Sequence, residues 1–328
     1  MYPTFQDAYL AELDKTFNEP EYRNSPRGFS SSERLGVSFT ITDAVQRHVA
    51  LPARRTNPIF CFAEALWYLA GTNDLSFISH YAPGITKYSA DGRTLQGTAY
   101  GPRIFRYPRV ELDQWARIRT VLREDPDSKR AVIQIFDPAE LQESGNIDVA
   151  CTLALQFLIR DGALCMVGFM RANDAFRGMV SDVFSFTMLQ EMMARQLGVP
   201  VGTYHHQVGS MHVYESDTEW ASKVLAEAAG RPAGSTETAF PAMPDGDNWP
   251  YVHAVLDWER ALRLGEAELS ADQLRALDLP DYWKHVVTLF ELQRRITTLG
   301  KRPCPDVVEL LPTVLRDSVT NRWPHLHI

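Results

Sequence analysis

The pair Asp161-Gly162 constrains the fold of this chain more than any other feature, because it separates two stretches that alternate like β-strands. The stretch before the pair is CTLALQFLIR and the stretch after it is ALCMVGFMRA. An Asp-Gly pair between alternating hydrophobic residues is the strongest short-range signal for a β-hairpin, since its tight turn needs positive φ at both central residues. The sequence therefore predicts an antiparallel hairpin with this pair at its tip.

A two-residue turn also predicts the register of the hairpin. Residue 160 pairs with residue 163, so Cys151 falls opposite Ala172 and beside Arg171, and a β-bulge would shift this by one residue. A neighbouring guanidinium favours the thiolate, which makes Cys151 a candidate nucleophile. The alternative is that Cys151 is a small apolar packing residue, as free cysteines usually are. We interpret the other three cysteines as packing residues: Cys61, Cys165 and Cys304.

The rest of the chain mixes helical and strand-like patterns. Apolar spacing predicts helices over residues 4–16, 58–70, 111–125, 181–198, 252–265 and 281–299, and alternation predicts strands over 36–43 and 131–137. Residues 230–250 are rich in Gly, Pro and Ser, which is typical of a connecting loop. The expected fold class is α+β, with the chemistry in the first two-thirds of the chain.

Composition excludes several classes of protein. The chain has 328 residues, of which 45% are hydrophobic, and its net charge of −8 gives no basic face for polymeric nucleic acid. Its four cysteines form no CxxC pair, so neither a zinc site nor a disulfide framework is indicated. The sequence shows no signal peptide and no apolar run of the roughly 18 residues that a membrane span needs. We therefore expect a cytoplasmic protein without a metal.

Four basic residues could together surround a phosphate group. Arg171 ends the second strand of the hairpin, Lys129 and Arg130 precede the strand over 131–137, and Arg27 lies near the N-terminus. Guanidinium groups match phosphate oxygens in geometry and charge. The alternative is that each is a solvated charge at the end of a strand.

The motifs, taken in order, resemble those of thymidylate synthase and its relatives, the cytidylate hydroxymethylases, from about residue 20 to 225. The resemblance places the active-site glutamate on Glu64 in FAEALWYLAGTND, a tyrosine on Tyr100 and the nucleophile on Cys151. It implies a thymidylate-synthase-like mixed sheet flanked by helices over residues 1–229. Residues 230–328 diverge from the family and are expected to form a mostly helical region packed on the same domain.

The resemblance also implies the ligands and their contacts. The co-substrate is 5,10-methylenetetrahydrofolate, the protein is a homodimer, and Lys129 and Arg130 reach the partner's phosphate site. The remaining implied contacts are Arg27, Arg171, Ala172 and Asn173 with the nucleotide, His212 and Tyr214 with the sugar 3′-hydroxyl, and Asp174 and Gly178 with folate.

Asp182 stands where thymidylate synthase has the asparagine that recognises uracil. Cytosine presents N3 as an acceptor and its 4-amino group as a donor, the reverse of uracil. A protonated carboxyl can donate to N3 and accept from the amino group, so Asp182 favours a cytidylate and, by protonating N3, activates C6. The alternative is that Asp182 is a helix cap or a first-turn acid.

Other departures concern the reaction and the sugar. Thr86 and Ser89 align with two tryptophans of thymidylate synthase, and their small side chains favour water addition over hydride transfer. Ala172 replaces a serine and Lys129 an arginine, which leaves room for a ribose 2′-hydroxyl. This combination resembles the CMP 5-hydroxymethylases of antibiotic biosynthesis, which form 5-hydroxymethyl-CMP. The alternatives are a dCMP hydroxymethylase and a thymidylate synthase acting on dUMP.

Two functions outside this family remain open from the sequence. A cysteine hydrolase could pair Cys151 with His205 or His206, although no nucleophile-elbow motif surrounds the cysteine. A nucleotide sensor could keep the fold without catalysis, but such a protein has no need of a reactive thiol.

Overall fold

The computed structural model describes residues 1–108, 110–230, 239–300 and 302–326. Its centre is a six-stranded sheet with the strand order β1-β2-β6-β5-β4-β3. The sheet is mixed, because β5 and β6 pair in parallel and the other neighbours pair antiparallel. The strands are β1 (Tyr22–Asn24), β2 (Ser31–Ile41), β3 (Val132–Gln134), β4 (Thr152–Arg160), β5 (Ala163–Asp174) and β6 (Val201–Tyr214).

The predicted hairpin is formed by β4 and β5. Asp161 has φ 49° and Gly162 has φ 75°, as the tight turn requires, and Arg160 pairs with Ala163. A bulge between Thr152 and Ala154 then shifts the register by one residue. Cys151 consequently lies opposite Arg171, whose backbone N–H donates to the Cys151 carbonyl at 2.8 Å. The pairing of Cys151 with Ala172 in an unbroken register is wrong, whereas the one-residue shift expected from a bulge is confirmed.

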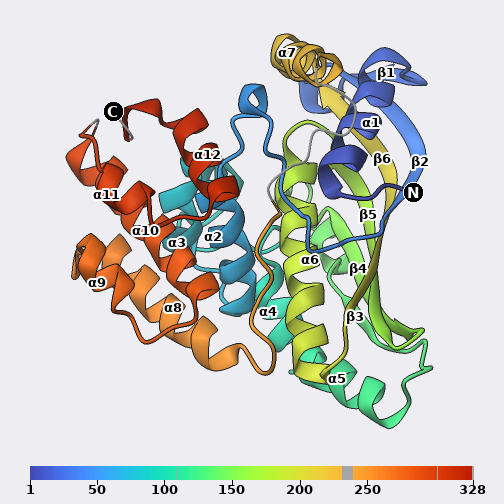
Figure 1. The fold of residues 1–328 in the computed structure, drawn as a ribbon. Coiled ribbons are helices and arrows are strands. Elements are labelled where there is room, and N and C mark those ends of the chain that lie inside the picture. Colours follow the sequence, from blue (N-terminus) through green and yellow to red (C-terminus); the bar gives the residue numbers. More distant parts are fainter. Residues whose placement is uncertain (109, 231–238, 301, 327–328) are drawn as a thin grey trace.

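Helices cover one face of the sheet, as Figure 1 shows. The parallel strands β5 and β6 are joined by α6 (Gly178–Leu197), which lies against the sheet together with α1 (Phe5–Asn18). The next layer contains α2 (Pro58–Leu69), which starts where the Asn57 side chain accepts from the Phe60 N–H. The remaining helices of this part are α3 (Leu75–Tyr81), α4 (Tyr100–Phe105), α5 (Gln114–Glu124) and α7 (Thr218–Ala229).

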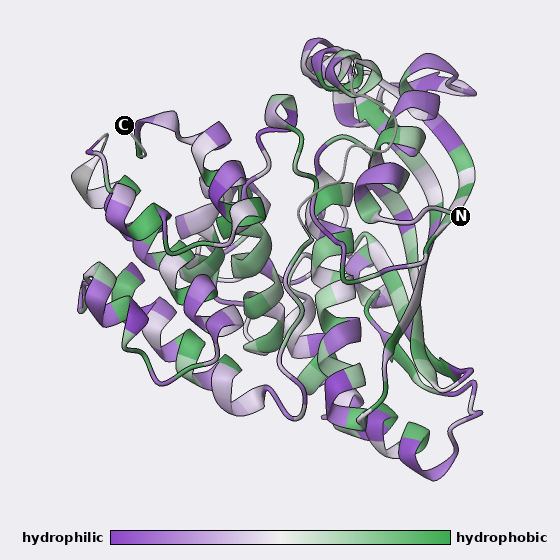
Figure 2. Ribbon diagram, in the orientation of Figure 1, coloured by the Kyte–Doolittle hydropathy of each residue, from purple (hydrophilic) through white to green (hydrophobic). Residues whose placement is uncertain are grey.

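Helix α2 is the most hydrophobic part of the interior and is coloured mainly green in Figure 2. All but one of its residues are buried, because α6 packs on one of its sides and α10 on another. No helix within the described residues combines the length and apolarity needed to cross a membrane.

The C-terminal helices form a layer on the far side of α2 from the sheet (Figure 1). They are α8 (Trp249–Arg263), α9 (Ala271–Arg275), α10 (Asp281–Leu299), α11 (Pro305–Val308) and α12 (Thr313–Arg322). Trp283 of α10 is fully buried and donates its indole N–H to the Asn248 side chain at 2.7 Å. The region is helical as predicted, while residues 231–238 of the predicted connecting loop lie outside the described residues.

Candidate active site

A cavity of about 730 Å³ opens at the carboxyl ends of β5 and β6. This volume suits a small organic ligand, since ligand pockets usually measure roughly 300–1,000 Å³. Its lining brings together six of the residues that the sequence predicted: Arg27, Cys151, Arg171, Ala172, His212 and Tyr214.

Cys151 is the nucleophile candidate, and its environment is not the one expected. Arg171 Nη2 lies 3.6 Å from the thiol, while its guanidinium also donates to the carbonyls of Ala150 and Val149 at 2.8 and 2.9 Å. Burial raises the pKa of the Cys151 thiol above its ordinary value, and this outweighs the lowering by the Arg171 charge. Arg171 thus favours the thiolate as expected, but its effect is smaller than that of burial, so the free protein holds a protonated thiol at neutral pH.

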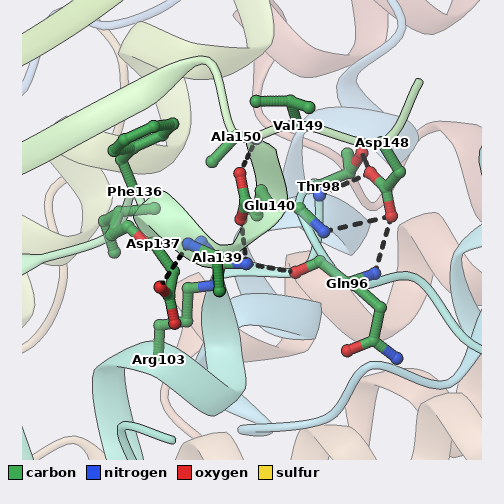
Figure 3. A network of polar contacts seen from close by, with 12 residues as sticks. Gln96, Thr98, Arg103, Phe136, Asp137, Ala139, Glu140, Asp148, Val149 and Ala150 are labelled. Atoms are coloured by element: carbon green, nitrogen blue, oxygen red, sulfur yellow. Dashed lines mark hydrogen bonds and ion pairs between the residues drawn. The ribbon is translucent and has the colours of Figure 1, made fainter. Parts of the chain in front are cut away.

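The segment before Cys151 is fixed by a buried carboxylate (Figure 3). Asp148 accepts hydrogen bonds from the backbone N–H groups of Gln96, Gly97 and Thr98 at 2.6, 3.0 and 2.8 Å, and also from the Thr98 hydroxyl. A side chain at Gly97 would collide with the Asp148 carbonyl, with its Cβ 2.0 Å from that oxygen. The two segments therefore approach so closely that position 97 requires glycine.

A buried ion pair fixes the same segment from the other side (Figure 3). Glu140 pairs with Arg103 of α4 and accepts from the Ala150 N–H at 2.8 Å. Arg103 also donates to the Gln96 carbonyl at 2.8 Å. Residues 96–98 and 148–150 are thus linked by two carboxylates immediately before the nucleophile.

Two buried carboxyl groups lie near each other behind the cavity lining, and one of them, Asp182, acts electrostatically on the Cys151 thiol. Glu64 of α2 is 7% exposed and accepts from the Ser185 hydroxyl at 3.3 Å, and burial raises its pKa to about 7. Asp182 of α6 accepts from Asn173 Nδ2 at 2.7 Å. Burial and the Glu64 charge raise the pKa of Asp182 well above its ordinary value, which favours the protonated carboxyl.

The position of Asp182 in α6 removes one alternative. The helix begins at Gly178 and Arg177 is its N-cap, with no acidic residue in the first turn. Asp182 hydrogen-bonds through its side chain to Asn173 of β5 rather than to a helix N-terminus. The interpretation of Asp182 as a helix cap or first-turn acid is therefore wrong.

The two histidines proposed for a hydrolase do not reach the thiol. His206 is fully buried and hydrogen-bonds to Asn173 Oδ1 at 3.0 Å and to the Tyr204 hydroxyl at 2.7 Å. His205 hydrogen-bonds to the hydroxyls of Thr40 and Thr203 at 3.0 and 2.9 Å. Among the described contacts neither imidazole bonds to Cys151, so the structure contains no Cys–His catalytic pair there.

The sugar and phosphate candidates occupy different places. His212 and Tyr214 share one face of β6, with ring centroids 5.0 Å apart. Burial raises the pKa of the Tyr214 hydroxyl, and the charge of Arg27 partly opposes this increase. Arg27 itself has φ 54° in the loop before β2. Lys129 and Arg130 are exposed and do not line the cavity of their own chain.

Tyr100, Asp174 and Gly178 surround the site without lining the cavity. The buried Tyr100 hydroxyl accepts from the Thr152 N–H at 3.3 Å, and its ring stacks on Tyr68 at 4.8 Å. Asp174 caps the loop after β5 by accepting from Phe176 and Arg177 N–H groups at 2.8 and 3.0 Å.

Sequence reasoning missed several cavity residues. Tyr88, between Thr86 and Ser89, lines the cavity. This segment therefore still supplies an aromatic ring, although both tryptophans of thymidylate synthase are replaced. Glu33 of β2 accepts from the Ser210 hydroxyl and from Asn24 Nδ2 at 2.7 Å within the cavity. Glu33 lies before the predicted strand over 36–43, because β2 begins at Ser31, so the sequence pattern did not single it out.

Comparison with known proteins identifies the family. The thymidylate synthase family matches residues 7–237, more than half of the chain. Together with the mixed sheet and the thiol in the cavity, this match defines an enzyme that transfers one-carbon units. The chain belongs to the thymidylate synthase family.

Three similar proteins from bacteriophages are named deoxyuridylate hydroxymethyltransferase. The Pseudomonas phage M6 protein is 34% identical over 282 residues, which are 82% of this chain and 76% of the phage protein. The Delftia phage PhiW-14 protein is 27% identical over 291 residues, 82% of this chain and 78% of its own length. The Bacillus phage SP01 protein is 32% identical over 203 residues, 59% of this chain, and the match spans about half (53%) of that relative.

Proposed function

We propose that this enzyme hydroxymethylates C5 of a cytidylate, with CMP preferred over dCMP. The observation that carries the proposal is the Asp182 carboxyl, whose pKa is raised well above its ordinary value beside Asn173. A neutral carboxyl offers one donor and one acceptor, which match N3 and the 4-amino group of cytosine. Uracil would place a donor against the carboxyl proton and an acceptor against its carbonyl oxygen.

The proposed reaction begins at Cys151. Its sulfur adds to C6 of the base, the thiol proton is released to a base, and C5 becomes nucleophilic. C5 bonds to the one-carbon unit that 5,10-methylenetetrahydrofolate supplies, and C5 then loses its proton as tetrahydrofolate leaves. Water adds to the resulting exocyclic methylene group, and elimination of Cys151 restores the aromatic base as 5-hydroxymethylcytidylate.

Glu64 is the proposed group that moves the proton at C5. Its pKa of about 7 lets the carboxyl take up and release a proton near neutral pH. Asp182 holds the base and supplies a proton to N3, which makes C6 a better acceptor for the thiol.

Asp174 and Gly178 are the residues we propose on the folate side. A Cβ at Gly178 would stand 3.4 Å from both Asn173 Nδ2 and Asp182 Oδ2. The glycine therefore keeps space open beside the residues that bind the base, which fits a folate ring stacked near them.

Water addition rather than hydride transfer is proposed from Thr86 and Ser89. Their hydroxyls are bonded locally, to the carbonyls of Pro83 and Thr94 at 2.9 and 2.7 Å. Neither residue carries a bulky ring, so this part of the site leaves more room for water than two indoles would.

The preference for ribose is proposed from Ala172 and Lys129. Ala172 lines the cavity next to Arg171 and pairs with Ser210 across the sheet. A serine there would fill part of the space that a 2′-hydroxyl needs. We expect Ala172→Ser with Lys129→Arg to shift kcat/KM from CMP toward dCMP.

A homodimer is part of the proposal, since Lys129 and Arg130 are exposed outside their own cavity. Among the described residues, helices cover only one face of the sheet, and its strands expose apolar side chains (Leu35 49%, Val132 38%, Leu153 36%). A second copy of the chain would bury them.

Hydroxymethylation of deoxyuridylate is the second candidate, because three similar phage proteins bear that name. One experiment separates the candidates: incubation with methylenetetrahydrofolate and CMP, dCMP, UMP or dUMP, with products analysed by mass. We expect hydroxymethylated CMP and release of tetrahydrofolate. Preferred conversion of dUMP would overturn the cytidylate proposal, and dihydrofolate release would indicate a synthase.

A further inference from the structure

A chain of buried hydrogen bonds leads from β6 to Asp182. The Tyr204 hydroxyl lies 2.7 Å from His206 Nδ1, His206 Nε2 lies 3.0 Å from Asn173 Oδ1, and Asn173 Nδ2 lies 2.7 Å from Asp182 Oδ2. Tyr204 and His206 are fully buried and Asn173 is 3% exposed. None of the four residues is among those that line the cavity. Asn173 directly follows a lining residue and Asp182 acts electrostatically on the lining Cys151, so Tyr204 and His206 can affect a ligand only through Asn173 and Asp182.

Tyr204, the residue of this hydrogen-bond network farthest from Asp182, fixes the donor and acceptor in each of its hydrogen bonds. Tyr204 has no hydrogen-bond partner among the described residues other than His206. A buried hydroxyl without an acceptor is costly, so the Tyr204 proton must be donated to His206 Nδ1. Because a neutral imidazole has one donor and one acceptor, His206 Nε2 then carries the other proton and donates to Asn173 Oδ1.

The protonation states of the two buried groups are compatible with this direction. Burial lowers the pKa of His206 to about 3, so the ring is neutral, and burial raises the pKa of Tyr204 well above its ordinary value. With Oδ1 of Asn173 held by His206, its amide nitrogen must face Asp182. A reversed amide would instead accept the Asp182 proton and donate to His206 Nε2. His206 Nδ1 would then donate to the Tyr204 oxygen, and the Tyr204 hydroxyl proton would have no acceptor.

The same logic places the proton of Asp182. Oδ2 of Asp182 accepts from Asn173, whereas Oδ1 has no hydrogen-bond partner among the described residues. The carboxyl proton therefore resides on Oδ1, where it can be donated to a base. We propose that Tyr204, His206 and Asn173 form a positioning relay that holds the Asp182 proton on Oδ1 and thereby sets the preference for cytosine over uracil. This inference rests on the proposed function and adds residues that lie outside the cavity.

The backbone around the relay leaves room for it. Gly168 of β5 pairs with His206 of β6, and a Cβ at Gly168 would lie 2.6 Å from the Tyr204 hydroxyl. Glycine weakens a strand interior, so its presence here fits a side chain that must approach the backbone closely. The tyrosine hydroxyl occupies that space.

The test compares variants by their ratio of kcat/KM for CMP to that for UMP. His206→Phe removes the donor to Asn173, which frees the amide to reverse, and the ratio should fall by about tenfold or more. His206→Gln can still accept from Tyr204 and donate to Asn173, so it should keep most of the ratio. Tyr204→Phe removes only the hydroxyl that fixes the direction of the hydrogen bonds, so its ratio should lie between those of the wild type and His206→Phe.

His205→Gln is the matched control, because this adjacent histidine bonds to Thr40 and Thr203 instead of Asn173. Its ratio should equal that of the wild type. The relay is refuted if folded Tyr204→Phe and His206→Phe both keep the wild-type ratio, or if His206→Gln falls as far as His206→Phe. Should His206→Phe not fold, the isosteric Tyr204→Phe decides alone.

The two proposals fail in different ways. A wild-type enzyme that converts uridylates in preference to cytidylates refutes the proposed function. A wild-type preference for cytidylates that the relay variants leave intact refutes the relay only.

Discussion

Cys151 and Glu64 each keep a proton to higher pH than they would in water. Burial is the main cause for both groups, and for Cys151 it exceeds the opposing effect of Arg171. A protonated thiol is a poor nucleophile, so the resting enzyme is protected from chance alkylation. Reaction requires a base that removes the thiol proton when the substrate is bound.

The first prediction concerns the thiol. Alkylation of Cys151 by iodoacetamide should have a pH midpoint above the 9.0 of an ordinary thiol. Arg171→Met should move the midpoint higher still, because the lowering charge is lost. Peptide mass spectrometry across a pH series measures this, and Cys151→Ala, which should also abolish turnover, is the control. A midpoint below that of a free thiol would contradict the buried environment.

The second prediction concerns the stability cost of Glu64. Its pKa is about 7 in the folded protein and 4.5 ordinarily, so the folded state binds the proton more tightly. The stability therefore falls as pH rises from 4.5 to about 7 and stays low above it. Glu64→Gln should remove this cost, up to about 3 kcal/mol at pH well above 7. Tm measured at two pH values should show a larger gain at pH 8 than at pH 5, and an equal gain at both would disprove the shift.

The third prediction concerns base choice. Asp182→Asn should lose activity toward CMP, because Asn173 would hold the new amide with its NH2 toward N3 and an amide cannot transfer a proton to N3 as a neutral carboxyl can. The loss of one such interaction is expected to cost roughly 1–3 kcal/mol, so the ratio of kcat/KM for CMP to that for UMP should fall about ten- to more than hundredfold. Asp113→Asn, at the N-cap of α5, is the control, because it makes the same substitution outside the site. An unchanged ratio in Asp182→Asn would show that Asp182 does not contact the base.

At the scale of the elements, the segment 138–150 depends on two carboxylates rather than on regular structure. Asp148 binds the N–H groups of residues 96–98, and Glu140 binds Arg103 and Ala150. Because β4 begins at Thr152, these contacts determine where Cys151 emerges into the cavity. The bulge at the start of the strand then turns its backbone toward Arg171.

The fourth prediction tests that arrangement. Asp148→Ala leaves three backbone donors without an acceptor, so it should lower the free energy of unfolding by about 1–3 kcal/mol and also reduce kcat. Asp113→Ala, which removes the N-cap of α5, should lower Tm but leave kcat unchanged. Thermal denaturation together with steady-state kinetics separates the two effects. Equal kcat in both variants would show that the segment positions Cys151 without Asp148.

For the whole molecule, α6 connects the sheet to the C-terminal helices. Its buried Glu191 pairs with Arg47 and Arg195 and accepts from the Met243 N–H at 2.8 Å. The chain between the catalytic part and α8 is thus attached to the helix that carries Asp182. The open face of the sheet, by contrast, is left for another copy of the chain in the proposed homodimer.

The fifth prediction tests that homodimer. If Arg130 serves the partner's site, Cys151→Ala should be inactive alone and Arg130→Ala weakly active alone. A mixed dimer contains one site with an intact thiol and an intact arginine, so mixing after reversible dissociation should restore activity to about a quarter of the wild-type value or less, as set by the fraction of mixed dimers. A mixture of Cys151→Ala with Glu64→Gln is the control, because both residues belong to the same chain's site. Failure of the first mixture to gain activity would place Arg130 outside the partner's site.

The sequence determined the elements whose signals are local. The Asp161-Gly162 turn, the hairpin register near it and the caps of α2 and α5 depend on residues a few positions apart. The family motifs, in their order along the chain, also predicted six residues of the cavity, because each motif is a short run of neighbouring positions.

Only the tertiary structure decided the protonation of the site and the relay. Asn173 and His206 are 33 residues apart and meet because β5 and β6 pair in parallel across α6. The raised pKa values of Cys151, Glu64 and Asp182 arise from burial by several elements at once. Desolvation depends on which surfaces pack together, and a linear pattern of residue types does not contain that information.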